Sequence, residues 1–165
     1  MTSEKSAGTK PKAAPASRID TSSIDAYVGY NLRRAATRQR ERFRSVFAPY
    51  DIRPVQLTAL TLIYHNAGLR QSALGRALDM KRANVVTLLD QLEQRGIAER
   101  RPAANDRRSY EIHLTEKGRT LTEELLAVHE KLEADLAHAL GEQNVDRLLD
   151  TLIRFRKVSP APKLD

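Results

Sequence analysis

Apolar and polar positions follow a helical period from Val85 onward and a strand period after Gly96. Four branched apolar residues recur at steps of three and four: Val85, Leu88, Leu89 and Leu92. This spacing predicts a helix with one buried face. Polar donors begin the same helix, because Lys81, Arg82 and Asn84 lie in its first turn. Gly96 is expected to end it, since the residue after a helix usually takes a positive φ.

The segment after Gly96 predicts a short β-hairpin. Ile97 to Arg101 forms the first strand, which is expected to end at Pro102 because proline has no N–H to donate. Residues 103–108 form a polar turn, and residues 110–114 alternate apolar and polar side chains, as a half-buried strand does. A donor-headed helix followed by a hairpin with arginines near its tip is typical of a winged helix-turn-helix. The alternative is an ordinary amphipathic helix and hairpin whose charges are only solvated.

Apolar periodicity also predicts helices on both sides of this segment, at residues 24–47, 55–65, 69–78, 115–140 and 145–157. Gly75 lies in the middle of one of them and costs about 1 kcal/mol relative to alanine, so close packing is expected there. Thr115 is expected to cap the long helix through its hydroxyl, and Gly141 is expected to end it.

The first and the last two helices carry apolar stripes that the rest of so short a chain cannot cover. A twofold dimer would bury these stripes against a second copy. The expected fold is mostly α with a small β-hairpin wing, a winged helix-turn-helix joined to a helical dimerisation domain. The expected parts are a disordered basic tail at residues 1–22, dimerisation helices at 24–53 and 119–157, a DNA-binding domain at 54–118 and a frayed tail at 158–165.

Charge is distributed unevenly along the 165 residues, whose net charge is +7. Residues 24–53 carry seven basic and three acidic side chains, whereas residues 119–165 carry seven basic and nine acidic ones. A basic excess outside the C-terminal helices is consistent with a polyanionic partner such as double-stranded DNA. The basic tail could add weak phosphate contacts, although an inert tail is the simpler reading.

Several classes of protein are disfavoured by the sequence. The absence of cysteine excludes disulfides, thiolate metal sites and thiol-based redox sensing. No apolar run has the length of a membrane span and the N-terminus has no apolar signal core, which predicts a cytoplasmic protein. Ser72 and Ser109 lack a His–acid pair in a hydrolase-like motif, and the four histidines lack the spacing of metal ligands. Neither an enzyme nor a bound cofactor is therefore expected.

Residues 106–115, DRRSYEIHLT, resemble the wing of the MarR family of bacterial transcription regulators, which has Asp, any residue, Arg, five residues and Leu-Thr. The segments QSAL at 71–74, LDQLEQRG at 89–96 and ERR at 99–101 are similar to the family as well. The resemblance extends over residues 24–156. It implies a dimer with two winged domains, in which Asp106 braces the wing and Arg108 enters the minor groove. It also implies a groove-facing set on the recognition helix: Arg82, Asn84, Val86 and Thr87.

The chemistry of these side chains suits DNA. Arg82 can bond two guanine acceptors and Asn84 can pair with adenine in the same way, while Thr87 and Gln91 suit either bases or phosphates. Candidate phosphate contacts, which fix register without reading sequence, are Arg70, Gln71, Ser72, Lys81, Arg100, Arg101 and Arg107. Lys81 stands where the family often has a capping Ser, Thr or Asp, so Asp79 or solvent is expected to cap this helix instead.

Arginines spaced four apart on the first helix suggest an anion site. Arg34, Arg38 and Arg42, together with His65, are candidate contacts for a small-molecule effector, either an aromatic carboxylate or an aromatic acyl-CoA thioester. The alternative is that these arginines only solvate the helix or pair across the dimer. The resulting hypothesis is a homodimeric transcriptional repressor that binds a palindromic operator and is released by the effector. The alternative function is a winged-helix module for protein contacts that lacks sequence-specific DNA binding.

Overall fold

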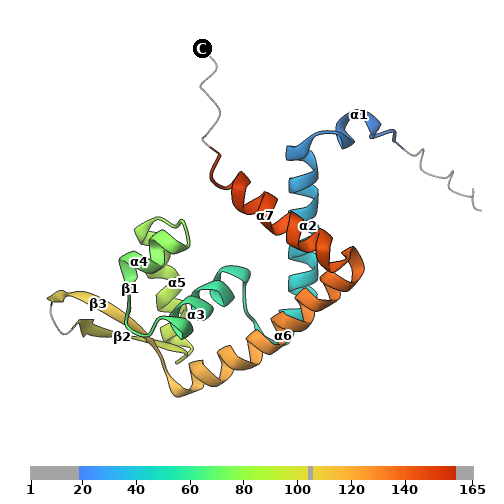
Figure 1. Cartoon of the computed structure of the whole chain (residues 1–165). Helices are drawn as coiled ribbons and strands as arrows, with labels where there is room; N and C mark the ends of the chain where they lie inside the picture. Colours follow the sequence, from blue (N-terminus) through green and yellow to red (C-terminus); the bar gives the residue numbers. More distant parts are fainter. Residues whose placement is uncertain (1–18, 104–105, 159–165) are drawn as a thin grey trace, which may run out of the picture. The chain divides into compact units, whose positions relative to one another are not determined.

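The structure is a computed structural model that describes residues 19–103 and 106–158, with the backbone alone described at 106–109. Helices dominate it (Figure 1), and they are α1 (Ser22–Asp25), α2 (Val28–Phe47), α3 (Pro54–His65), α4 (Gln71–Ala77), α5 (Arg82–Gln94), α6 (Glu116–Leu140) and α7 (Glu142–Phe155), with a 3-10 turn at Ala48–Tyr50. Three strands, β1 (Leu69–Arg70), β2 (Ala98–Ala103) and β3 (Asp106–Leu114), form an antiparallel sheet in the order β1-β3-β2. The predicted fold class, mostly α with a small β wing, is confirmed.

The chain divides into two compact units, Met1–Gln39 and Arg40–Asp165. The helix predicted at residues 24–47 is broken in the first unit, where α1 ends at Asp25 and α2 begins at Val28. The Asn31 side-chain amide donates to the carbonyl oxygens of Asp25 at 2.7 Å and Tyr27 at 3.0 Å. A side chain that bonds nearby carbonyls competes with the helical pattern, which accounts for the break.

The core of the second unit is built from the predicted apolar stripe of α5 and the elements around it. All four stripe residues are buried, together with Leu60 and Ile63 of α3, Ile112 of β3 and Leu125 of α6. Gly96 has a φ of +65° and follows α5, as predicted. The expectation of close packing at Gly75 is also confirmed, because an added Cβ would lie 3.2 Å from a methyl group of Val85.

The sheet differs from the predicted hairpin in three ways. Leu69 and Arg70, which were predicted to be helical, pair with Ile112 and Glu111 as a third strand, so that α4 begins only at Gln71. Two residues are too few for a strand period to show in the sequence. Pro102 lies inside β2 opposite Tyr110 rather than after it, because β2 is an edge strand where a missing N–H is tolerated. The predicted turn at 103–108 is shorter, since β3 already begins at Asp106.

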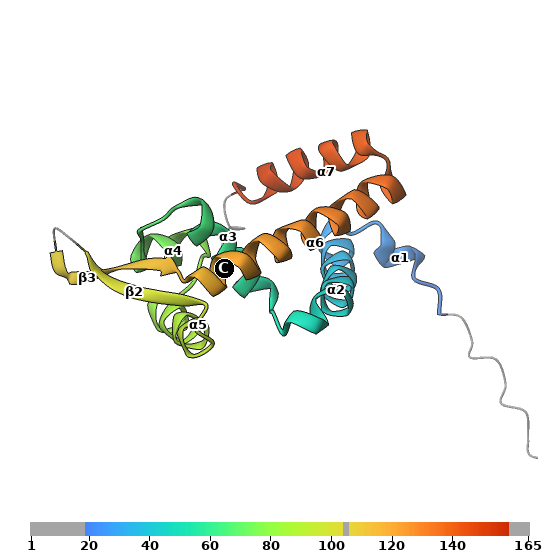
Figure 2. The same cartoon turned by 90° about the horizontal axis from the view of Figure 1, so that it is seen from below.

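Helix α6 begins where the sheet ends. The Thr115 hydroxyl accepts the Gly118 N–H at 3.0 Å, which confirms the predicted cap. Gly118 lies against the backbone of Ile97, so closely that no side chain fits between them. Gly141 ends the helix with a φ of +83°, and α7 follows at once from Glu142, earlier than the predicted Val145. Figure 2 shows α7 returning alongside the second half of α6.

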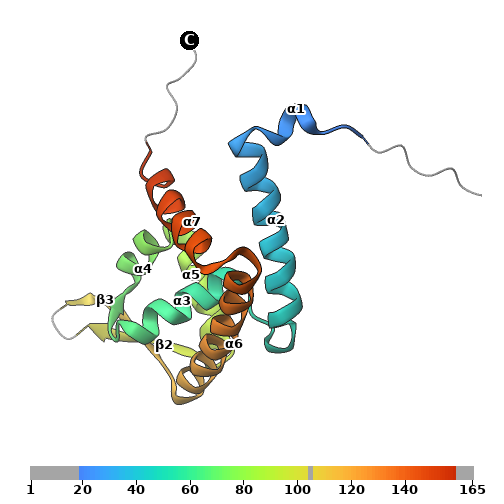
Figure 3. The ribbon, with the colours of Figure 1, turned by 45° about the vertical axis from the view of Figure 1, so that its right-hand side comes forward.

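Helix α3 packs beside the first half of α6, as Figure 3 shows. The Tyr64 hydroxyl donates to the Glu123 carboxylate at 2.9 Å, and this hydrogen bond, with a smaller contribution from desolvation, raises the pKa of Tyr64. The guanidinium of Arg119 lies 5.5 Å from the centre of the Tyr64 ring. These contacts join α3 to the first half of α6.

Within residues 19–103 and 106–158, no helix is both long enough and apolar enough to cross a bilayer. The same described segments contain no cluster of three or more His, Asp or Glu side chains that could hold a metal ion.

Candidate nucleic-acid interface

A tight turn sets the angle between α4 and α5. Asp79 has a φ of +50°, a left-handed conformation that few residues other than glycine adopt, and the Met80 N–H donates to the Gly75 carbonyl at 2.9 Å. Because Gly75 has no side chain, Val85 of α5 can pack directly against α4. The turn therefore holds two helices at close range with the start of α5 at the surface.

The first turn of α5 exposes side chains that donate hydrogen bonds, and no side chain among the described residues caps the N-terminus of this helix. Lys81 is the N-cap residue, and its side chain makes no capping hydrogen bond, nor does Asp79 take that role. Arg82, Asn84 and Thr87 are all exposed. The positive end of the helix dipole is thus available to an anion.

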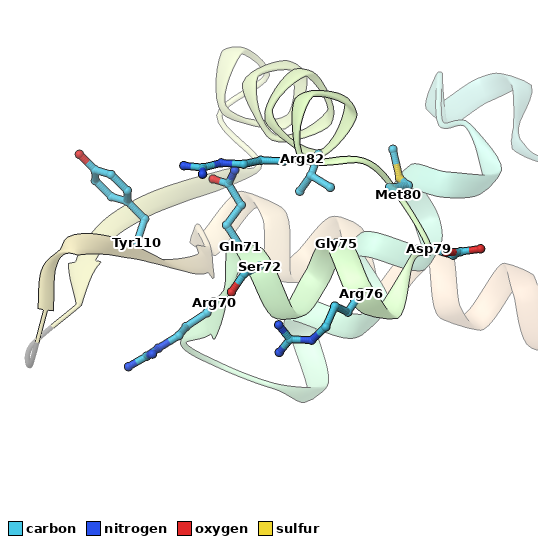
Figure 4. Close-up of a pocket in the computed structure, with 10 residues that line it drawn as sticks. Arg70, Gln71, Ser72, Gly75, Arg76, Asp79, Met80, Arg82 and Tyr110 are labelled. Carbon is cyan, nitrogen blue, oxygen red and sulfur yellow. The ribbon is translucent and has the colours of Figure 1, made fainter.

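The predicted base-reading residues divide into two groups. Steps of three and four place Asn84, Thr87 and Gln91 in one row along α5. The Gln91 side-chain oxygen accepts a hydrogen bond from the buried Gln56 amide at 3.4 Å, and this bond orients the Gln91 side chain. Arg82 lies apart from this row and extends over Gln71 toward the wing, as Figure 4 shows.

A groove of about 600 Å³ lies where α4, α5 and the sheet meet (Figure 4). Its lining includes Arg70 from β1, Gln71 and Ser72 from the first turn of α4, and Tyr110 from β3. Arg76 and Arg82 add two further cations, against a single lining carboxylate, Asp79. The structure thus brings together three of the predicted phosphate contacts in a groove whose charge favours a polyanion.

Arg100 has an intramolecular role that the sequence did not indicate. Its Nη1 atom lies 2.7 Å from Asp90 Oδ1 and 2.6 Å from Glu93 Oε2, and its Nη2 atom donates to the Val86 carbonyl at 3.2 Å. The Glu93 carboxylate also accepts the Arg100 backbone N–H at 2.8 Å. Strand β2 is therefore clamped to α5, and a phosphate contact by Arg100 stays a prediction. The next residue, Arg101, is exposed and pairs with Glu99 of its own strand.

The predicted wing-tip residues Asp106, Arg107 and Arg108 lie at the start of β3. Their side chains fall outside the described part of the structure, so the bracing role of Asp106 and the minor-groove role of Arg108 stay predictions. Their backbone places them at the far end of the hairpin from α6 (Figure 1).

The candidate effector residues lie on two helices. Arg34, Arg38 and Arg42 belong to α2, and the Arg42 guanidinium donates to the Leu132 carbonyl of α6 at 3.5 Å. His65 is the last residue of α3 and meets the Tyr64 ring edge-on, with 5.2 Å between the ring centres. Arg34 and Arg38 are exposed, whereas Arg42 is half-buried.

Two groove residues were missed by sequence reasoning, Arg76 and Tyr110. Arg76 sits in a predicted helix with no motif around it. Tyr110 shares a strand face with the buried Ile112, yet nearly half of its own surface is exposed. A ring on the apolar face of a strand that extends beyond the core is the signal that could have identified Tyr110.

Comparisons with known proteins agree with this geometry. A family model described as the MarR family matches residues 52–110. The putative transcriptional regulatory protein for the hcr operon of Thauera aromatica is 28% identical over 155 residues, which cover 93% of each protein. Among solved structures, the transcriptional repressor CouR bound to a 23-mer DNA duplex has 33% sequence identity to this chain. The two structures match with a TM-score of 0.81, over 85% of this chain and 99% of CouR. CouR bound to p-coumaroyl-CoA is 29% identical with a TM-score of 0.77, covering 86% and 100%.

The fold and its basic groove define a winged helix-turn-helix protein of the kind that binds DNA. The chain belongs to the MarR family, because a relative at 33% identity is matched over almost its whole length. It is a DNA-binding transcription regulator of that type, a class without enzymatic activity. The resemblance drawn from the sequence is confirmed, and DNA binding is favoured over a module for protein contacts.

Proposed function

We propose that the protein is a homodimeric repressor that places α5 of each subunit in the major groove of a palindromic operator. The observation that carries this proposal is the groove in which the starts of α4 and α5 meet the wing with Arg70, Arg76 and Arg82 in its lining. Phosphates bound in this groove would set the register, while Asn84, Thr87 and Gln91 meet base edges. Two half-sites about one helical turn apart, about 34 Å, would match the symmetry of a dimer.

The first test is operator binding by the wild-type protein and by Arg108→Ala. The region upstream of the protein's own gene supplies the duplex, footprinting maps the site, and fluorescence anisotropy measures affinity at fixed salt. A guanidinium in a narrow minor groove gains from its enhanced negative potential, so Arg108→Ala is expected to weaken binding at least about tenfold. Unchanged affinity would reject the minor-groove role of Arg108.

We also propose that a small aromatic anion releases the repressor from DNA. Two observations support this part, the row of Arg34, Arg38 and Arg42 on α2 and the p-coumaroyl-CoA bound by the relative CouR. An aromatic acyl-CoA thioester carries phosphates that such arginines can pair, and an aromatic carboxylate carries a single anionic group. A coupling free energy of about 1–3 kcal/mol between the two ligands is enough to change occupancy of the operator.

A thermal shift screen of benzoic and hydroxycinnamic acids and their CoA thioesters tests the effector. A true ligand is expected to raise the Tm, and Arg38→Ala is expected to reduce that shift because one cation of the row is lost. Arg44→Ala is the matched control, since Arg44 is exposed on the same helix but lies outside the row. Equal shifts in the two variants would favour the alternative that the row only solvates the helix.

A further inference from the structure

Helix α5 carries one branched apolar residue that lies outside the hydrophobic core. Val85, Leu88, Leu89 and Leu92 are each less than 5% exposed, whereas Val86 is 36% exposed. Val86 therefore contributes little to burial, although it sits in the middle of a helix whose other exposed side chains are mostly polar. Its side chain is therefore an apolar group that a partner outside the chain could contact.

Two neighbours extend Val86 into an apolar patch. Ala83 is exposed one turn earlier, at the i−3 position that adjoins Val86 on the helix surface. The Thr87 hydroxyl donates to the Ala83 carbonyl at 3.2 Å. A hydroxyl turned back to the helix in this way leaves the threonine methyl group on the outer side. The methyl groups of Ala83, Val86 and Thr87 thus form what we call the methyl patch.

The surroundings of the methyl patch fix its position relative to the wing. The Val86 carbonyl accepts from the Arg100 guanidinium at 3.2 Å, and Arg100 belongs to strand β2. Arg82 and Asn84 border the patch along the helix with groups that donate hydrogen bonds. The methyl patch is thus held in place and bordered by side chains that donate hydrogen bonds. Such a surface is complementary to one that presents both hydrogen-bond acceptors and a methyl group.

The major groove of DNA presents such a surface, because the thymine C5-methyl group is the apolar group among the polar edges of the four bases. We infer that the methyl patch of α5 reads thymine methyl groups, with Val86 as the residue that discriminates thymine from a pyrimidine without that methyl. The inference rests on the proposed function, since it needs α5 in the major groove. It also assigns Thr87 to an apolar contact, in place of the hydrogen bond expected from the sequence.

Duplexes in which deoxyuridine replaces thymine test this inference, because the two bases differ only by the methyl group. The mapped operator is synthesised with one thymine replaced in each half-site, position by position, and affinity is measured by fluorescence anisotropy at fixed salt. Burial of one methyl group corresponds to about a fourfold change in Kd, so replacement in both half-sites is expected to weaken binding about fifteenfold at the contacted position.

The variant Val86→Ala assigns the effect to the methyl patch. It is expected to lower affinity for the thymine duplex and to shrink the thymine-to-uridine ratio to less than about twofold per half-site. Val158→Ala is the matched control, because Val158 is exposed outside α5 and its loss is expected to leave the ratio unchanged. Circular dichroism checks that both variants are folded.

Three results would overturn the inference. Equal affinity for all thymine and uridine duplexes would show that no methyl group is read. A full thymine preference retained by Val86→Ala would show that another group reads it. If the wild-type protein binds none of the duplexes, including the thymine operator, then the proposed operator binding itself fails, which separates that failure from the other two.

Discussion

At the scale of single residues, two glycines decide how closely elements approach. Gly75 lets α5 pack on α4, and Gly118 lets α6 pack on the backbone of Ile97 where the sheet begins. A side chain at Gly118 would place its Cβ 1.8 Å from the Ile97 carbonyl oxygen, which is far inside any permitted contact. The position of α6 relative to the wing therefore depends on the absence of one carbon atom.

Gly118→Ala is expected to lower the free energy of unfolding by at least about 2 kcal/mol, because backbone rather than a flexible side chain must move. Thermal and urea unfolding followed by circular dichroism measure the change. Gly29→Ala is the control, since Gly29 lies in α2 with no atom within 4 Å of an added Cβ, and it is expected to be neutral or stabilising by up to about 1 kcal/mol. Equal unfolding curves for Gly118→Ala and the wild-type protein would contradict the close approach.

At the scale of elements, the clamp between α5 and β2 links the recognition helix to the wing. Arg100 bonds Asp90, Glu93 and the Val86 carbonyl of α5 from its place in β2. The two elements proposed to contact DNA, α5 in the major groove and the hairpin beside it, are thereby held in one orientation. A phosphate contact by Arg100 would have to compete with these partners.

Arg100→Ala is expected to destabilise the protein by about 1–3 kcal/mol and to speed amide hydrogen exchange in β2 and β3, because two carboxylates lose their partner. Arg101→Ala is the matched control, since its pair with Glu99 is exposed and is expected to add less than about 1 kcal/mol. Urea unfolding and hydrogen-exchange mass spectrometry provide the two measurements. If both variants exchange at the wild-type rate, the clamp does not hold the wing.

At the scale of the whole molecule, α7 presents an apolar face that the described residues leave exposed. Between 44% and 52% of the surface is exposed at each of Leu148, Leu149, Ile153 and Phe155. Such a face is consistent with the proposed twofold dimer, because in a twofold dimer each copy would bury the α7 face of the other.

Leu149→Glu is expected to convert the protein from a dimer, with twice the 18.6 kDa mass of one chain, into a monomer. The reason is that a charge would be buried without a partner in the interface. Analytical ultracentrifugation at micromolar concentration measures the mass. Gln143→Glu adds the same charge on the polar side of α7, which carries Asp146, Arg147 and Asp150, and this variant is expected to remain dimeric. A monomeric wild-type protein would refute the proposed assembly.

Local patterns in the sequence determined the helices, the cap at Thr115, the turn glycines and the family. The helices, the cap and the glycines depend on residues within a few positions of one another, and the family resemblance depends on four short segments. Periodicity, side-chain chemistry and local motifs are therefore enough to read them. The short strand at Leu69–Arg70 and the break before α2 escaped prediction, since the first exists only through pairing with β3 and the second through the Asn31 side chain.

The tertiary structure alone decided which charges remain for a ligand and which are used internally. Arg100 and Arg101 are adjacent and looked equivalent, yet one clamps α5 and the other is exposed. Likewise the family resemblance placed Val86 on the groove-facing side of its helix, but the packing of α5 is what shows how much of its side chain stays exposed. A sequence specifies the side chain at each position, but its partners come from segments distant along the chain, and those are fixed only when the chain folds.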